Sequence, residues 1–350
     1  MPEPRMSLID SIKKKYPQTP ISVMRQAIFD HQSGGTDFTR NKTLIQSALR
    51  QSGYDALADK MAQCSPSNRC KSPYCDSCQR SLFGRQRRKS DEFLWHPYRH
   101  DETKARENLF FVTILHELIP FDLPDDTLIR FPLTKVKTAI AEARTHLKAI
   151  RRTFKDRINL IGAFELEVVS GLLVCLHPVK GQVLAEMSGS QIELQDKFIL
   201  LHSHFVVDLS EFPPDPLSGD LAVDQFKARL KKSWPAKKQI DVSPLYLKKP
   251  VHESLNRLAD YPLKFPIKYY YRWNGAFEEN QIDLDGKKQN LARNHEMDVM
   301  AQMISGVSEL GMNALYIRLG VSKASIDKSK KRDAKADAFF RKVGPPRDLD

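Results

Sequence analysis

The run KFILLHSHFVVDL, residues 197–209, places His202 and His204 inside an almost wholly apolar stretch. Its β-branched and aromatic residues predict a β-strand. Because alternate residues of a strand share one face, both imidazoles are expected to point the same way, one pleat apart. The apolar flanks place the pair at the centre of a sheet rather than in a loop.

A neighbouring strand could supply an acidic partner for these histidines. The run NLIGAFELEVVSG, residues 159–171, predicts a strand with Glu165 and Glu167 at alternating positions. Two neutral imidazoles and a carboxylate can bind one divalent cation, and a metal or a lysine would offset the cost of burying a carboxylate. Alternating histidines can also be the polar face of an edge strand, but the two glutamates favour the metal site.

The rest of the chain predicts an α+β fold with an N-terminal helical region. Residues 133–157 have the pattern of a long amphipathic helix, with an apolar stripe from Val136 to Ile150. Between residue 171 and residue 196 we expect only short β-like pieces and turns. The remaining expectations are helices within residues 1–63 and at 221–234, 252–260 and 289–311, strands at 108–118 and 239–247, and a loosely ordered lysine-rich tail from Ser322 onward.

Four of the five cysteines lie within fifteen residues. Cys64, Cys70, Cys75 and Cys78 follow the spacing C-x5-C-x4-C-x2-C. The final CxxC is typical of thiolates that share a tetrahedral ion, so the cluster predicts a structural zinc site. The alternative is four free or disulfide-bonded thiols. Cys175 stands alone in an apolar run and is interpreted as a small buried side chain.

Charge and hydrophobicity limit the classes of function. The 350 residues include 55 Lys and Arg against 43 Asp and Glu, a net charge of +12, and 41% are hydrophobic. This composition excludes a mostly disordered or collagen-like chain and favours a polyanionic partner, with nucleic acid ahead of a membrane surface. We see no secretory signal or transmembrane run and expect a cytoplasmic protein. The basic residues next to the cysteines, suited to phosphate contact, are Arg80, Arg85, Arg87, Arg88 and Lys89.

The histidine pair, together with three other segments, resembles the HUH superfamily, the endonucleases of rolling-circle plasmid replication initiators and related transposases. FFVTILHE, residues 110–117, looks like the first motif of that family, and the strand with Glu167 is similar to the one that supplies its third metal ligand. Residues 260–264, DYPLK, look like its tyrosine motif. The cysteine-rich segment resembles one found ahead of the nuclease in some members. The resemblance covers about residues 64–270, and Ser203 departs from the hydrophobic residue expected between the two histidines.

The resemblance implies a central antiparallel sheet of RRM or ferredoxin-like type. From the resemblance and from the residue patterns outside it, we expect a helical region (1–63), a zinc module with a basic helix (64–107), an endonuclease core (108–285) and a C-terminal helix with a basic tail (286–350). The resemblance also implies that Glu167, His202 and His204 hold Mg²⁺ or Mn²⁺, that Tyr261 forms a 5′-phosphotyrosine, and that Lys264 favours the phenolate. The implied partners are single-stranded or supercoiled origin DNA and a host helicase, in the cytoplasm of a bacterium.

Several alternatives stay open at this point. Pro262 disfavours helical geometry at the tyrosine before it, and Tyr269, Tyr270 and Tyr271 are rival nucleophiles or a stacking surface for single-stranded DNA. The same nicking chemistry could serve a transposase. A non-catalytic zinc-containing DNA-binding regulator would use the histidines only for packing. A hydrolytic metallophosphoesterase would need more carboxylate ligands than we find.

Overall fold

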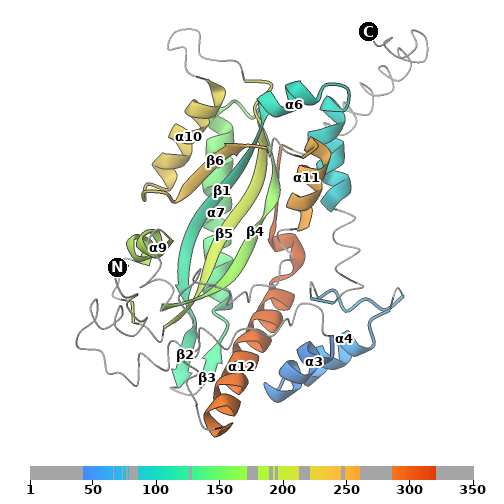
Figure 1. Ribbon diagram of the computed structural model, residues 1–350, viewed down its shortest axis with the longest axis vertical. Coiled ribbons are helices and arrows are strands. Elements are labelled where there is room, and N and C mark those ends of the chain that lie inside the picture. The colour runs from blue at the N-terminus through green and yellow to red at the C-terminus, as the bar shows by residue number, and fades with distance from the viewer. Residues whose placement is uncertain are drawn as a thin grey trace, which may run out of the picture.

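A five-stranded antiparallel sheet, with strand order β6–β1–β5–β4–β7, lies at the centre of the computed structural model (Figure 1). Its strands are β1 (Leu109–Pro120), β4 (Asn159–Ser170), β5 (Lys197–Asp208), β6 (Ile240–Pro244) and β7 (Tyr316–Leu319). The histidine-bearing strand β5 is the middle strand and pairs with β1 and β4. The predicted α+β class with a central antiparallel sheet is therefore confirmed.

Helices surround this sheet, and a short hairpin lies beside it. The structure describes residues 42–65, 67–72, 74–75, 78, 86–125, 128–171, 180–188, 192–193, 196–212, 221–245, 249–260 and 286–320. The helices are α3 (Lys42–Gln51), α4 (Asp55–Ala62), α6 (Glu102–Asn108), α7 (Leu133–Thr153), α9 (Lys180–Ser188), α10 (Ala222–Ser233), α11 (Val251–Asp260) and α12 (Gly286–Leu310). The shorter elements are η2 (Asp91–Trp95), η3 (His96–Tyr98), η5 (Met312–Ala314) and the hairpin of β2 (Asp122–Asp125) and β3 (Leu128–Arg130). Among these described segments, none combines the length and apolarity that a bilayer-spanning helix requires.

One face of the sheet carries the main hydrophobic core. The predicted apolar stripe of α7 is buried there from Val136 to Ile150 and packs with Phe226 and Leu230 of α10. Side chains such as Phe164 and Phe205 meet these helices from the sheet. In a strand the next residue along points to the opposite face, so this packing fixes the face on which His202 and His204 lie.

The opposite face is covered at its two ends. At one end α6, η2 and α11 bury residues such as Ile161 and Val206 of the sheet. At the other end α9 places Leu184 against Phe198 and Leu200. The two histidines of β5 lie between these apolar clusters. The residues that bracket them in sequence therefore also bracket them in space.

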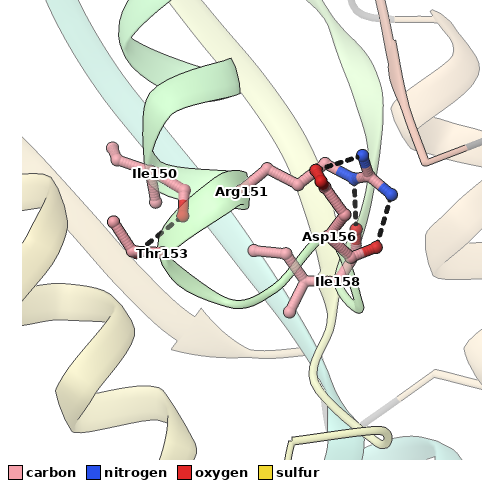
Figure 2. Close-up of polar contacts among 5 residues, drawn as sticks. All are labelled: Ile150, Arg151, Thr153, Asp156 and Ile158. Atoms are coloured by element: carbon pink, nitrogen blue, oxygen red, sulfur yellow. Dashed lines mark hydrogen bonds and ion pairs between the residues drawn. The ribbon is translucent and has the colours of Figure 1, made fainter.

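The turn from α7 into β4 is held by one arginine (Figure 2). Arg151 donates to the carboxylate of Asp156 at 2.6 Å, to the carbonyl of the same residue, and to the carbonyl of Ile158 at 3.0 Å. Asp156 has φ +57°, a left-handed conformation in which aspartate is among the better tolerated residues. These contacts stop the helix and direct the chain into the strand that carries Glu165.

Several features differ from the sequence expectations or go beyond them. Residues 180–188 form helix α9, where short β-like pieces were expected. Strand β7 was not predicted; it pairs with the start of β4. Helix α12 contributes Val299 and Met303 to the main core and Met300 and Ile304 to a second core with α3 and α4. The expectations for residues 1–41, for Cys175 and for the tail from Ser322 lie outside the described residues.

A buried histidine on the main-core face should make the fold acid-sensitive. Burial, with a smaller contribution from His146, lowers the pKa of His116 to about 3, whereas an unfolded histidine has a pKa near 6.5. Between these values the unfolded chain binds more protons, so the stability of the folded state falls as the pH falls. We expect the wild type to lose roughly 3 kcal/mol more than His116→Phe on going from about pH 7 to about pH 4.

Urea unfolding of both proteins at both pH values measures this difference. Acid effects shared by the two proteins cancel in the comparison. An equal loss in both would contradict a buried, neutral His116.

Candidate metal centres

Two histidines and a glutamate converge at the centre of the sheet. In the β4–β5 ladder Glu165 lies directly opposite His202, while His204 lies opposite Ala163. The Glu165 carboxylate oxygen Oε2 is 3.3 Å from His204 Nε2 and 3.8 Å from His202 Nε2. One ligand atom from each of the three residues lies within 4.8 Å of the others. The predicted side-by-side arrangement of the imidazoles is thus present.

The ring of His204 is oriented by strand β1. Thr113 is its partner in the ladder, and Thr113 Oγ1 lies 3.0 Å from His204 Nδ1. Phe111 stacks on the same ring, with 5.7 Å between ring centres and an angle of 5° between planes. With Nδ1 engaged in this way, Nε2 is directed toward Glu165. A hydrogen bond to the second ring nitrogen is the usual way in which proteins fix a metal-binding histidine.

The donor set fits a divalent cation. Two imidazole nitrogens and a carboxylate oxygen suit ions such as Mn²⁺, and three protein ligands leave positions for water or a substrate oxygen. The side chains of His202, His204 and Glu165 are each only about a tenth exposed, at 9%, 12% and 12%. A carboxylate this enclosed requires a cationic or hydrogen-bonding partner, which a bound metal ion would provide.

The geometry favours Glu165 over Glu167 as the third ligand, which revises the sequence interpretation. Glu167 Oε2 lies 3.8 Å from His202 Nε2, but Glu165 is the acid that is close to both histidines. The side chain of Glu167 is also more exposed, at 26%. It lies one pleat farther along β4, opposite Leu200. Glu167 therefore borders the site, where it can contact a metal-bound water or an incoming ligand.

The four cysteines converge in a second site. Their sulfur atoms lie within 4.8 Å of one another, with Cys64 Sγ 3.5 Å and Cys70 Sγ 3.6 Å from Cys78 Sγ. Zinc–sulfur bonds of about 2.3 Å imply sulfur–sulfur edges of about 3.8 Å in a tetrahedral site. All four thiols are free. The cluster therefore has the dimensions of a four-thiolate zinc site and not of a disulfide pair.

Backbone amides turn inward onto the sulfurs. The Cys70 amide donates to Cys64 Sγ at 3.4 Å, and the Lys71 amide donates to Cys78 Sγ at 3.2 Å. Burial opposes ionisation of Cys64, but the hydrogen bonds it accepts lower its pKa to about 7. Burial raises the pKa values of Cys70 and Cys78. Metal binding at this site would therefore release protons from the buried thiols.

One tyrosine connects the two sites. Tyr74 lies directly before Cys75, is partly buried, and packs against both the main core and the core that contains the cysteines. Burial and the negative charge of Glu165 raise its pKa. Tyr74 thus packs against both cores and is within electrostatic range of the acid of the histidine site. Sequence reasoning missed Tyr74, because nothing in the spacing of the cysteines shows which way the loop between them faces.

The other predicted site residues are only partly described. Arg87 and Arg88 are exposed on the helical segment 86–90, as phosphate-binding residues must be. Lys89 Nζ is 3.1 Å from a carboxylate oxygen of Glu92 and lies over the Phe93 ring, so its charge is partly compensated. Outside the described residues lie Arg80, Arg85, Tyr261, Lys264, Tyr269, Tyr270 and Tyr271.

The helix that precedes Tyr261 lies over the histidine face. Val251 and Leu255 of α11 pack with Val206, which points to the same face as His204. Helix α11 ends one residue before Tyr261. The chain therefore approaches the predicted tyrosine from the side of the sheet on which the candidate metal site lies.

No family model, curated protein or solved structure matches the chain in comparisons with known proteins.

Proposed function

We propose that this protein is a plasmid replication initiator that nicks and rejoins single DNA strands through a metal-dependent 5′-phosphotyrosine. The observation that carries the proposal is the convergence of Glu165, His202 and His204 on the two central strands of the antiparallel sheet. Its partner would be single-stranded or supercoiled origin DNA in a bacterial cytoplasm, with a host helicase as a further partner. The net charge of +12 suits a polyanion.

The topology supports a ferredoxin-like core, which is the core that the resemblance to HUH endonucleases implies. The chain order β1–α7–β4–β5–α10–β6 with sheet order β6–β1–β5–β4 is the split βαβ arrangement. Its two crossover helices, α7 and α10, pack on one face. The histidines lie on the other face, between the apolar clusters at its two ends.

Each residue of the site has a role in this reaction. Glu165, His202 and His204 would hold Mg²⁺ or Mn²⁺, and Thr113 would keep His204 oriented. The bound ion supplies Lewis-acid stabilisation of the scissile phosphate. The phenol oxygen of Tyr261 attacks phosphorus, the bond to the 3′ oxygen breaks, and that oxygen leaves as a 3′-hydroxyl. The phosphotyrosine retains the bond energy, so reversal of the step rejoins the strand.

Ionisation of the nucleophilic tyrosine depends on a cation near its phenol oxygen. Free tyrosine has a pKa near 10, so the phenolate must be stabilised at neutral pH. Lys264, three residues after Tyr261, is the residue proposed for this role. Structural zinc in the four-cysteine site would hold the neighbouring helices in place.

Replacing Tyr261 by phenylalanine is expected to abolish covalent capture of DNA. Purified protein is incubated with Mn²⁺ and either single-stranded or supercoiled DNA, and adducts are separated on a denaturing gel. The wild type should give a protein–DNA adduct and Tyr261→Phe none, because phenylalanine has no nucleophilic oxygen. Tyr269→Phe, Tyr270→Phe and Tyr271→Phe are the matched controls and should keep the adduct.

Two outcomes would change the proposal. Loss of the adduct in Tyr269→Phe with retention in Tyr261→Phe would move the nucleophile. The absence of any adduct in the wild type would favour the zinc-containing DNA-binding regulator, which the complete four-cysteine cluster also supports. A chelator would unfold such a regulator and abolish its DNA binding, and the regulator would not cleave DNA under any condition.

A further inference from the structure

Ser203, the residue between the two histidines, has its own partner on the other face of the sheet. It is fully buried, and its hydroxyl lies 2.8 Å from Nε2 of His116 on β1. Burying an unbonded hydroxyl is unfavourable, and this hydrogen bond removes that penalty. This contact lies on the face of the sheet opposite the two histidines. It explains why a small polar residue stands between them.

His116 is the extra residue of a β-bulge. In the ladder between β1 and β5, Leu115 is opposite His202 while Glu117 is opposite Leu201, so the register shifts by one residue at His116. Bulges of this kind bend a strand and re-aim the side chains beside them. This bulge lies directly opposite His202. The β1 segment that carries Thr113 pairs with β5 on one side of this bulge.

The ring of His116 is held in an aromatic cage. Its centre lies 5.4 Å from that of Phe164 on β4 and 5.1 Å from that of Trp234 at the end of α10. Its Nδ1 atom is buried and has no hydrogen-bond partner among the described residues. The hydrogen bond to Ser203 therefore adds a directional side-chain contact between the bulge and β5.

We propose that the Ser203–His116 hydrogen bond is a positioning device for the histidine metal site. It fixes the bulge, and the bulge fixes the register in which Thr113 faces His204. A one-residue slip of β1 would turn Thr113 to the opposite face and release His204 Nδ1. Ser203 and His116 would then act on the metal through the orientation of the imidazoles, without touching it. This inference rests on the proposed metal-dependent function.

The test is Mn²⁺ binding to the full chain, measured by calorimetry with zinc retained in the cysteine site. We expect Ser203→Ala and His116→Phe each to weaken Mn²⁺ binding by about tenfold, the lower end of the effect of losing an outer-shell partner. His116→Gln, whose amide can replace Nε2 as the partner of Ser203, should bind within about threefold of the wild type. Thermal unfolding and zinc content confirm that each variant is folded.

A double-mutant cycle separates positioning from a general loss of structure. Thr113→Val should weaken Mn²⁺ binding on its own but add little in the Ser203→Ala background, because both changes release the same imidazole. Additive effects, or a folded Ser203→Ala that binds Mn²⁺ like the wild type, would overturn the positioning role. A wild type that binds no Mn²⁺ outside the zinc site would overturn the proposed function itself. The two failures are therefore distinguishable.

Discussion

His202→Ala should lose metal-dependent DNA nicking by about three orders of magnitude, since Lewis-acid stabilisation of a phosphoryl transition state is worth several kcal/mol. The imidazole of His202 is the donor that faces both acids of β4, with each carboxylate 3.8 Å away. Alanine at this position removes a ligand and leaves Glu165 with a single histidine. Nicking of a single-stranded oligonucleotide, measured as a function of Mn²⁺ concentration, gives the loss.

Glu165 and Glu167 provide a matched pair within the same experiment. Both become neutral and isosteric as glutamine, and both lie on the same face of β4. We expect Glu165→Gln to approach the effect of His202→Ala, because Glu165 contacts both histidines. Glu167→Gln should cost only about tenfold, the lower end of the loss when a group beside the metal ligands is removed. The reverse order would restore Glu167 as the third ligand and would show that β4 shifts when the metal binds.

The sequence predicted this site well because the relevant pattern is local. Two histidines two residues apart in an apolar strand must share a face. The choice between Glu165 and Glu167 is different, because both alternate in the same way along β4. Only the register of β4 against β5, which places Glu165 opposite His202, separates them. The resemblance to a family motif favoured Glu167, and the register that favours Glu165 cannot be read from the sequence.

Other features depend on contacts between distant segments and carry no local signal. The bulge at His116 lies beside a hydrogen bond to Ser203, which is 87 residues away in the chain. Tyr74 lies near Glu165 because of how the cysteine loop folds onto the sheet. Strand β7 is only four residues long, and it is stabilised by pairing with β4 rather than by its own sequence. By contrast, the long stripe of α7 was predicted because it repeats over many turns.

Removing zinc should unfold the N-terminal side of the structure before the sheet. The second core joins Cys70, Cys75 and Cys78 with apolar residues of α3, α4 and α12, among them Leu49 and Met300. Apart from these helices the cysteine segment has little apolar surface to bury, so a zinc ion bound there would order it. We expect Cys75→Ser to lose bound zinc and to become sensitive to protease within α3 and α4. The same variant should lower the midpoint of thermal unfolding by roughly 5 °C or more.

The fifth cysteine is the matched control for this prediction. Cys175→Ser removes a thiol outside the cluster and should keep one zinc ion per chain and a protease-resistant α3. Mn²⁺ binding provides the second readout: because Tyr74 connects the cysteine segment with the surroundings of Glu165, zinc loss should weaken but not abolish it. A Cys75→Ser protein that keeps its zinc, or that loses zinc with α3 and α4 still resistant to protease, would contradict a structural role. In that case the apolar contacts of α12 alone would suffice to hold the helices, and the cysteines would have to be assigned to redox or catalytic chemistry.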